Sequence, residues 1–460
     1  MGNQSQAMSD KMLQKPIKML LLQFGIPTVF SVFVLSCLNL IDSYFAKLIG
    51  ETTVGAVGVV FSLHAMIQAM GYFIGLGAGS LLSKELGKKE EGNPKQYLVN
   101  AIRLSLFWGI FITVFGSIFV KKIMQLLGAS KECYEESVLY GRYIFGGALL
   151  ILFAFVVSNL LRAVGEMKKA MLGIVIGVAA NLVFHFLFVV VLPLGVHGIG
   201  IATLLGHLVS LLLSGIFLWK ESVKLEGGKS VKQDGDEQSL SVAAYCKGFA
   251  SMLLIMKVGL PSLFRQGTGS VAVAVMNKMA GSISADFQSA MAVSNKIILL
   301  LMSLSIGLSQ AMQPLIGCNH GAKREERVRQ TFVSGAVSGT VLMTLLAVIT
   351  YFGAGLLSGW FVNEEEVQEM VVKLLHFQCM AMPFMMFANA ANMLYQAVNR
   401  PLPASFIAAL RQGIFLLPLL FLLPMLFQDF GLYIAQPLSD VLTFFACIPF
   451  VVCYFRGVKG

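Results

Sequence analysis

The stretch Val333–Tyr351, VSGAVSGTVLMTLLAVITY, runs for 19 residues without a charged side chain. An α-helix needs about 20 such residues to cross the hydrocarbon core of a bilayer. Leu21–Cys37, Ala148–Leu161 and Leu204–Trp219 are further apolar stretches of this kind, and Ser405–Phe427 is another with one charged residue, Arg411. Together they predict a chain that crosses a membrane several times.

The composition points the same way, because 57% of the 460 residues are hydrophobic and only 13% are charged. Soluble proteins carry about 25% charged residues. A net charge of +10 would indicate a nucleic-acid partner only if the basic residues shared one soluble face, and here they lie in short gaps between apolar runs. The seven cysteines form no close pair, so we predict neither a metal site nor disulfides.

Twelve candidate spans can be placed, and one extended polar stretch, Lys220–Lys247, separates the sixth from the seventh. We therefore expect an N-terminal six-helix lobe at 1–219, a cytoplasmic linker at 220–249 and a C-terminal six-helix lobe at 250–460. The spans are expected at approximately 18–46, 53–83, 98–120, 138–162, 169–193, 197–219, 250–279, 286–318, 329–353, 371–398, 402–426 and 431–455.

The basic residues of the loops predict the orientation. Alternate loops divide them as 25 Lys and Arg on one side, with Arg400 and Arg411 among them, and 6 on the other. Because cytoplasmic loops carry the excess of positive charge, both termini and the linker are predicted to be cytoplasmic. The polar, basic Met1–Lys18 segment is not typical of a signal peptide. We expect a multi-pass protein of the cell (inner) membrane.

The two halves resemble one another. Gly25-Ile26-Pro27 recurs as Gly259-Leu260-Pro261, and Ala163-Val164 recurs as Ala397-Val398, each 234 residues later. An even number of helices in each half makes the repeats parallel. The predicted fold is an all-α polytopic membrane protein with twelve transmembrane helices in two parallel six-helix bundles around a central cleft. Rocking of such bundles is the physics of a secondary transporter.

Four segments, taken in order, carry a resemblance to a known family. They are Gly25-Ile26-Pro27, Leu40-Ile41-Asp42-Ser43-Tyr44-Phe45, Gly75-Leu76-Gly77-Ala78-Gly79-Ser80 and Gly317-Cys318-Asn319-His320-Gly321-Ala322-Lys323. The set resembles the prokaryotic branch of the multidrug and toxic compound extrusion (MATE) family over essentially the whole chain. The resemblance implies efflux of amphipathic, often cationic compounds, driven by inward flow of protons or sodium ions.

Asp42 is the first candidate for ion coupling. An ionisable side chain inside a span is costly, which marks it as functional. The alternative is an interfacial aspartate that caps the helix end. In the family that the chain resembles, the amino-half site joins this aspartate to polar residues of the fourth to sixth helices. The matching residues here are Asn159, Asn181 and Thr203.

His185 stands where that family places a second carboxylate, one helical turn from Asn181. Sodium prefers oxygen ligands, whereas a histidine beside an aspartate can relay a proton. We therefore predict H⁺ as the coupling ion, with Na⁺ as the alternative. A histidine that only packs in the core is the other interpretation of this residue.

The C-terminal half carries unusual cations. The family's other coupling pattern has acids in the seventh and tenth helices, but the seventh here has Arg265 and Gln266. Lys296 follows in the eighth span, and Asp286 or Asp440 could pair with either cation. Unpaired, the cations would favour anionic groups of a substrate. The residues predicted to line the substrate cleft are Asp42, Arg265, Gln266, Lys296 and Asp440.

Pro27 and Pro261 lie at equivalent positions of the two halves. A proline inside a helix removes a backbone hydrogen bond and favours a kink. We expect both helices to bend, and we hypothesise that protonation of Asp42 biases the bend at Pro27.

Taken together, the sequence predicts an antiporter that exports amphipathic drugs or toxic organic compounds in exchange for H⁺. The alternative is an exporter or flippase of lipid-linked saccharides or anionic metabolites. No HExxH, GxSxG or phosphate-binding glycine motif is present, so an enzyme is not expected, and no catalytic residue is assigned. We expect no cofactor besides the coupling ion. The expected partners are amphipathic small molecules and membrane lipid, without nucleic acid, and the chain is expected to be a monomer.

Overall fold

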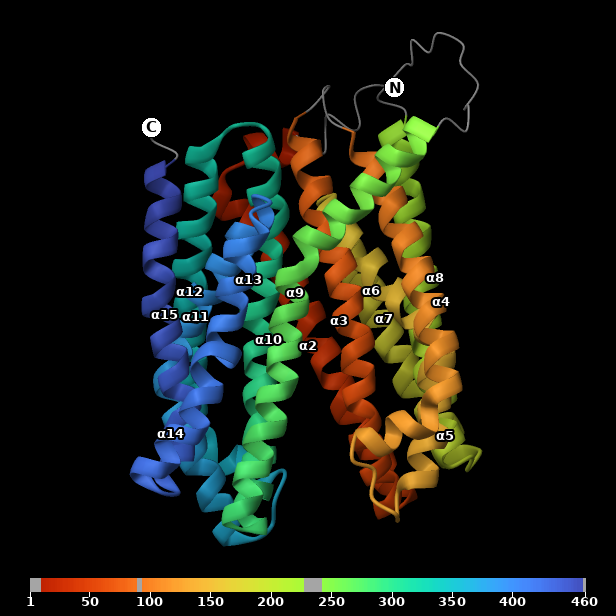
Figure 1. Ribbon diagram of the computed structural model, residues 1–460, viewed down its shortest axis with the longest axis vertical. Coiled ribbons are helices and arrows are strands. Elements are labelled where there is room, and N and C mark those ends of the chain that lie inside the picture. The colour runs from red at the N-terminus through yellow and green to blue at the C-terminus, as the bar shows by residue number, and fades with distance from the viewer. Residues whose placement is uncertain (1–9, 89–92, 227–241, 458–460) are drawn as a thin grey trace. The chain divides into compact units, whose positions relative to one another are not determined.

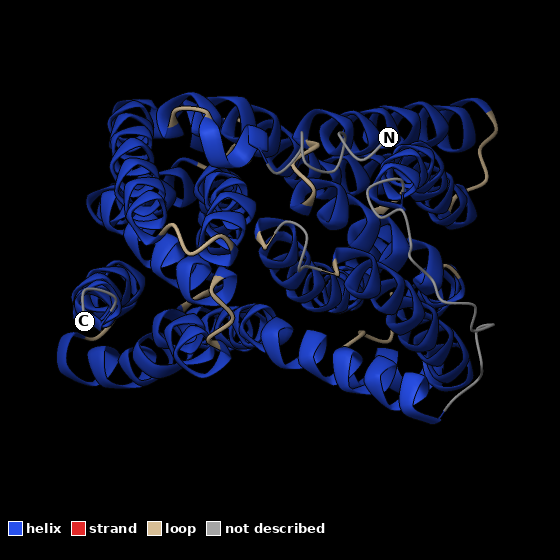
Figure 2. Cartoon of the chain, turned by 90° about the horizontal axis from the view of Figure 1, so that it is seen from above, coloured by secondary structure: helices blue, strands red, loops and turns tan. Residues whose placement is uncertain are grey.

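The computed structural model describes residues 10–88, 93–226 and 242–457, apart from the side chains of 39, 40, 224–226 and 242–247. Within these ranges every regular element is helical (Figures 1 and 2). The elements are α2 (Ile17–Ile49), α3 (Glu51–Gly87), α4 (Pro94–Leu126), α5 (Tyr134–Gly146), α6 (Ala148–Ala163), α7 (Met167–His185), η2 (Phe186–Val191), α8 (Val196–Glu226), α9 (Val242–Ile283), α10 (Ala285–Gly321), α11 (Glu325–Gly359), α12 (Glu365–Ala397), α13 (Pro401–Ala409), η3 (Leu410–Leu416), α14 (Leu417–Phe427) and α15 (Phe430–Gly457).

Eleven of the described helical segments are long and apolar enough to cross a membrane, and a bent pair raises the number to twelve. The pair is α5 and α6, which meet at an angle of 52°. Gly147 lies at the bend, where a Cβ atom would collide with the side chain of Leu204 on α8. The predicted fold class, an all-α polytopic membrane protein, is confirmed.

The predicted linker at 220–249 is helical wherever it is described. Helix α8 continues to Glu226, and α9 begins at Val242. Residues 220–226, KESVKLE, include lysine, glutamate and leucine, which are good helix formers even in water. The polar composition therefore marked where the apolar run ends, not where the helix ends. Residues 227–241 of the predicted linker lie outside the described residues.

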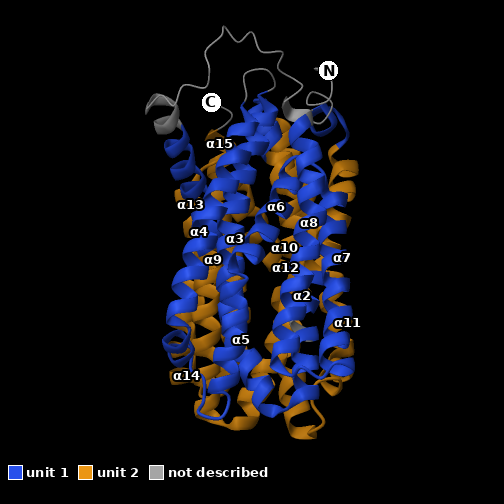
Figure 3. Cartoon of the chain, turned by 90° about the vertical axis from the view of Figure 1, so that its right-hand side faces the viewer, with its two compact units in different colours: residues 1–16, 34–263, 317–323 blue, residues 17–33, 264–316, 324–460 orange. Residues whose placement is uncertain are grey.

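The chain divides into two compact units, coloured separately in Figure 3. Unit 1 comprises residues 1–16, 34–263 and 317–323, and unit 2 comprises residues 17–33, 264–316 and 324–460. Helix α2 thus contributes its first half to unit 2 and its second half to unit 1. The division into lobes at 1–219 and 250–460 stays a prediction.

Small residues set the spacing of α7 and α8 in unit 1. A Cβ atom at Gly177 would lie 2.6 Å from the Ser210 Cβ, and one at Gly206 would lie 2.6 Å from the Asn181 Cβ. Gly173 and Gly177 form the small-xxx-small pattern that lets helices in a membrane approach closely. The close approach presses Asn181 against α8, which positions the site described below.

Two π-helical turns interrupt the spans. One, η2, directly follows His185 at the end of α7, and the other, η3, separates α13 from α14 and contains Arg411. A π-helical turn shifts the side chains after it onto a different face of the helix, and such turns are frequent at functional sites. Each unit therefore carries a basic residue at such a turn.

Candidate functional site

Asp42 is enclosed in unit 1. Its side chain lies in the second half of α2 and the residue is 4% exposed, while His185 at the end of α7 is fully buried. The His185 Nε2 atom is 3.4 Å from the Asp42 Oδ1 atom. The aspartate therefore faces a base inside the unit and does not cap the end of a helix in solvent.

The hydrogen bonds of His185 fix its tautomer. Its Nδ1 atom lies 2.9 Å from the backbone oxygen of Asn181, which can only accept, so Nδ1 carries a proton. In the neutral ring, Nε2 then offers a lone pair toward Asp42 Oδ1. Neither of these two facing atoms has a hydrogen-bond partner among the described residues. Two facing acceptors repel each other, so the contact requires one proton between them.

Polar and aromatic groups surround this pair. Asn181 and Thr203 are buried, and the Asn181 Nδ2 atom donates to the backbone oxygen of Ala202 at 3.4 Å. The Tyr140 phenol lies within interaction range of both Asp42 and Thr203. The ring of Phe45 stands 5.1 Å from the His185 ring, centre to centre, and shields it. The structure thus places four of the predicted coupling residues near one another, namely Asp42, Asn181, His185 and Thr203.

A cavity of about 30 Å³ lies beside these residues in unit 1. Asn181 and Thr203, which belong to the surroundings of Asp42, line its wall, whereas Asp42 and His185 are not among its lining residues. The Asn181 Oδ1 atom is buried without a hydrogen-bond partner among the described residues. The cavity is roomy enough for about two water molecules by volume.

Asn159 makes its hydrogen bonds outside this group. Its Nδ2 atom donates to the Phe155 backbone oxygen at 2.8 Å, and its Oδ1 atom accepts from Arg162 at 3.3 Å. The neighbouring Ser158 lines the cavity instead. A residue one position along a helix points about 100° away, so placing the residue on the correct helix was not sufficient to predict its direction.

Both prolines that are predicted to bend helices lie inside continuous α-helices, Pro27 in α2 and Pro261 in α9. Near Pro27, the Thr28 hydroxyl donates to the Phe24 backbone oxygen at 2.7 Å. The bending role of the prolines stays a prediction.

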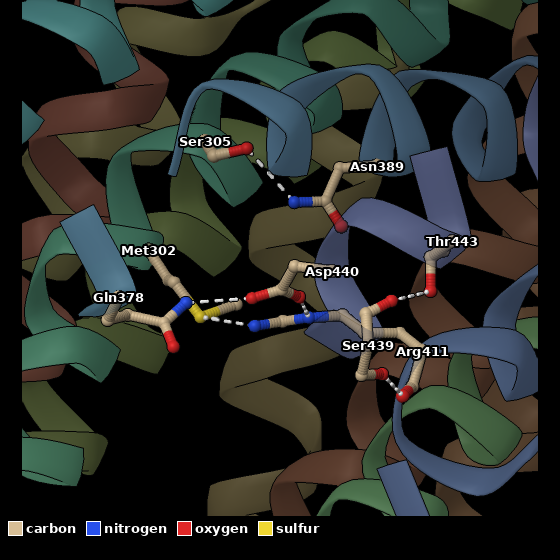
Figure 4. Close-up of polar contacts among 8 residues, drawn as sticks. All are labelled: Met302, Ser305, Gln378, Asn389, Arg411, Ser439, Asp440 and Thr443. Carbon is tan, nitrogen blue, oxygen red and sulfur yellow. Dashed lines mark hydrogen bonds and ion pairs between the residues drawn. The ribbon is translucent and has the colours of Figure 1, made fainter. Parts of the chain in front are cut away.

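Unit 2 holds a second buried acid, and its partners correct the predicted pairing (Figure 4). Asp440 forms an ion pair through Oδ1 with Arg411 Nε, and its Oδ2 accepts from Gln378 Nε2 at 2.7 Å. Asp440 therefore pairs with neither Arg265 nor Lys296. Arg411 was counted with the basic residues of the cytoplasmic loops although it falls inside the predicted span 402–426, and the structure places it within that span. It lies in the π-helical turn η3, from which its side chain reaches Asp440 on α15.

The other candidates of unit 2 lie at varied depths. Arg265 is partly buried, and its Nη1 donates to Asn392 Oδ1 at 3.5 Å. Gln266 is also partly buried, whereas Lys296 and Asp286 are exposed. The substrate cleft stays a prediction, with Asp42, Arg265, Gln266, Lys296 and Asp440 as its predicted lining.

Two contributors were missed by the sequence reasoning. Tyr140 lies in α5 beside Asp42, and the only signal was a tyrosine within a predicted span. Arg411 had a stronger signal, because a cation in one apolar run and Asp440 in the next are opposite charges on consecutive spans.

The described residues contain no group of three or more histidine, cysteine, aspartate or glutamate side chains that could hold a metal ion.

The chain has apolar helices in repeated halves, and an acid and a base are enclosed among them. These features are typical of secondary transporters. The chain belongs to the MatE family, the multidrug and toxic compound extrusion transporters, whose profile matches residues 27–187 and 261–422. The two matches begin at residues 27 and 261, which are 234 positions apart. The internal repeat predicted from the sequence is thereby confirmed.

Individual relatives are distant but cover most of the chain. A protein from Shewanella oneidensis named FAD transporter is 24% identical over 95% of this chain and 94% of its own length. The multidrug export protein MepA of Staphylococcus saprophyticus is 21% identical over 90% of this chain and 88% of its own. A multidrug resistance MATE family transporter solved in an outward-facing conformation is similar with a TM-score of 0.88, at 20% identity and 98% coverage of both chains. This likeness shows the fold.

Proposed function

We propose that the protein exports organic compounds across the cell membrane in exchange for protons, and that the Asp42–His185 pair binds the proton. The observation that carries the proposal is the 3.4 Å approach of His185 Nε2 to Asp42 Oδ1. Both atoms are buried, and His185 already uses its other nitrogen on the Asn181 backbone oxygen. The pair therefore has room for one exchangeable proton.

Proton binding changes the charge inside unit 1. With the proton, the pair is either a neutral acid beside a neutral base or an ion pair, and both have zero net charge. Without it, one negative charge stays in a buried and largely apolar environment, which is costly. A conformation that admits water to Asp42 relieves that cost. Loss of the proton therefore favours a different conformation from proton binding, and this difference is what couples an ion to transport.

The residues favour H⁺ over Na⁺. Sodium requires several oxygen ligands, and the position that the family fills with a carboxylate holds His185 here. The side-chain oxygens available are those of Asp42, Asn181, Thr203 and Tyr140, and the Thr203 hydroxyl donates to Ile199 at 2.9 Å. The imidazole directs a nitrogen at the carboxylate from within the site. That arrangement suits a proton.

Purified protein in lipid vesicles tests the proposal, with ethidium as the transported probe. We expect an imposed pH gradient to drive ethidium movement. Asp42→Asn should lower the driven rate at least about tenfold, the effect of losing about 1.4 kcal/mol of coupling. Asp286→Asn is the matched control, because it removes an exposed carboxylate and should behave as the parent protein does.

A sodium gradient at equal pH tests the alternative coupling ion, Na⁺. We expect it to leave ethidium movement unchanged. Movement driven by sodium and unaffected by the pH gradient would contradict proton coupling, and vesicles that move ethidium only when ATP is supplied would contradict secondary transport altogether.

A second candidate differs in the substrate. The relative named FAD transporter and the partly buried Arg265 guanidinium, which is held by Asn392, favour export of an anionic compound. Flavin adenine dinucleotide and ethidium can be compared in the same vesicles. If the vesicles move the dinucleotide but not ethidium, the substrate is an anionic compound. The Asp42–His185 pair would still bind the coupling proton in this case.

We further propose residence in the inner membrane with both termini in the cytoplasm, as the 25 to 6 division of Lys and Arg indicates. Arg411 moves from the loops into a span, but one residue does not reverse this division. We expect the protein to act as a monomer, without enzymatic activity or nucleic-acid partners. The orientation is tested with a C-terminal tag, which a protease should cleave only after the cells are opened. Light scattering of the purified protein tests whether it is a monomer.

A further inference from the structure

Two histidines that the Asp42 site does not use meet elsewhere in unit 1. His64 on α3 and His207 on α8 are both buried, and their rings stand 5.4 Å apart, edge to face. Phe155 packs beside His207 at 6.1 Å between ring centres. Buried polar groups normally have hydrogen-bond partners, yet the His207 Nε2 atom has none among the described residues.

A small cavity lies between this pair and the surroundings of the Asp42 site. Thr203 and His207 lie one turn apart on one face of α8, and both line the cavity. Asn181 lines it from α7, and the backbone oxygen of Asn181 meets His185 Nδ1. Most of the wall is apolar, but the Asn181 Oδ1 and His207 Nε2 atoms are buried there without a hydrogen-bond partner in the described residues. Water in the cavity can bond to these two atoms, and the volume admits about two water molecules.

We propose that the His64–His207 pair is a second proton-binding site, and that water in this cavity carries the proton between it and Asp42. The proposal rests on the proton-coupled function proposed above and adds a path to it. The proton leaves the Asp42–His185 pair for water, and water gives a proton to the lone pair of His207 Nε2. No other bond changes.

The contact between the two rings limits the pair to one proton. His64 is the titratable group that acts on His207 directly, and two imidazolium rings in contact would repel each other. The other ionisable groups on the remaining helices of unit 1 that precede α8 are Cys37, Asp42, Tyr44 and Lys47 on the second half of α2, Lys95, Tyr97, Arg103, Lys121 and Lys122 on α4, Tyr134, Glu135, Glu136, Tyr140, Arg142 and Tyr143 on α5, Arg162 on α6, and Lys168, Lys169 and His185 on α7. The four basic residues of α4 are exposed.

Two assays in ethidium-loaded vesicles separate a proton path from a structural role. One measures movement driven by a pH gradient, and the other measures exchange of labelled for unlabelled ethidium at equal pH, which needs no net proton movement. We expect His207→Gln to lower the driven rate at least about tenfold. Exchange and ethidium affinity should stay within about twofold of the parent, a difference of only ~0.4 kcal/mol.

Two further variants sharpen the test. Ala154→Val adds two methyl groups to the cavity wall without removing a polar group, so it should displace water and also slow only the driven movement. His197→Gln is the matched control, because His197 is on the same helix but is exposed and bonded to Tyr143 at 2.8 Å. It should behave as the parent does. Thermal unfolding of each variant verifies the fold.

A substrate-independent measurement accompanies the transport assays. In ¹⁵N-histidine spectra of the parent, the ring of His207 should gain a proton as the sample is acidified. A ring that stays neutral until the protein unfolds overturns the proposal. So does a His207→Gln variant that keeps the parental driven rate, or that lowers driven movement and exchange equally. A parent protein that does not respond to a pH gradient instead refutes the proposed function itself, and this path with it.

Discussion

Asp42 of unit 1 and Asp440 of unit 2 are both buried acids, and they differ in the base that each one faces. Asp42 faces His185, the residue directly before the π-helical turn η2, and Asp440 faces Arg411, the second residue of η3. Local architecture is therefore alike in the two units. The chemistry is not, because an imidazole exists in both a neutral and a charged form whereas a guanidinium stays charged.

This difference indicates separate tasks. The Asp42–His185 contact requires one proton and leaves both facing atoms without other partners, so its charge can change. Both carboxylate oxygens of Asp440 are bonded, one to Arg411 and one to Gln378, and the Arg411 Nη2 atom reaches the Met302 sulfur at 3.1 Å. Such a closed cluster ties α10, α12, η3 and α15 together. One pair is suited to exchanging a proton, and the other to fixing the structure.

The largest effect should come from breaking the fixed pair. Arg411→Gln leaves the Asp440 charge buried without its counter-ion, so we expect unfolding in detergent to become easier by about 3–5 kcal/mol. The double variant Arg411→Gln, Asp440→Asn should recover most of that loss, since it leaves no buried charge. Denaturant unfolding of both variants measures the difference. A single variant as stable as the double variant would erase the distinction between the two units.

A smaller effect is expected where α7 meets α8. Gly206→Ala places a Cβ atom 2.6 Å from the Asn181 Cβ, and overpacking of this kind costs about 1–3 kcal/mol. Gly215→Ala on the same helix meets open space and is the control. Thermal unfolding and pH-driven ethidium movement should both decline in the first variant only. Equal behaviour of the two alanines would mean that this helix contact does not position the site.

The most selective change converts the base into an acid. His185→Asp supplies oxygen ligands in place of a nitrogen, so we expect sodium to stimulate ethidium movement by about fivefold, the low end of coupling effects. His197→Asp, an exposed histidine changed in the same way, should give no stimulation. If the His185 variant ignores sodium and remains driven by the pH gradient, the choice of ion is not made at this residue.

Much of this arrangement could be predicted from the sequence. Apolar runs and the 234-residue repeat gave the membrane class, and the one-turn spacing of Asn181 and His185 placed them on one face of a helix. These signals succeed because bilayer thickness and helical pitch are fixed quantities.

The incorrect predictions concern residues in irregular helical turns and residues whose side-chain direction depends on packing. Arg411 was counted with the loop residues although the predicted span 402–426 contains it, and its ion pair with Asp440 forms from within the π-helical turn η3. Asn159 was placed on the correct helix, but its direction depends on the packing of α3 and α6. His64 gave no signal, because the partner that gives it meaning is 143 positions away at His207.

The burial of Asp42 has a consequence for inhibition. The residue is only 4% exposed, and its Oδ1 atom faces His185. In this conformation, cargo therefore cannot displace the coupling proton by direct competition for the carboxyl group. An inhibitor that occupies the cargo's position should therefore leave the proton's equilibrium with Asp42 intact, and only a change in helix packing could transmit its presence.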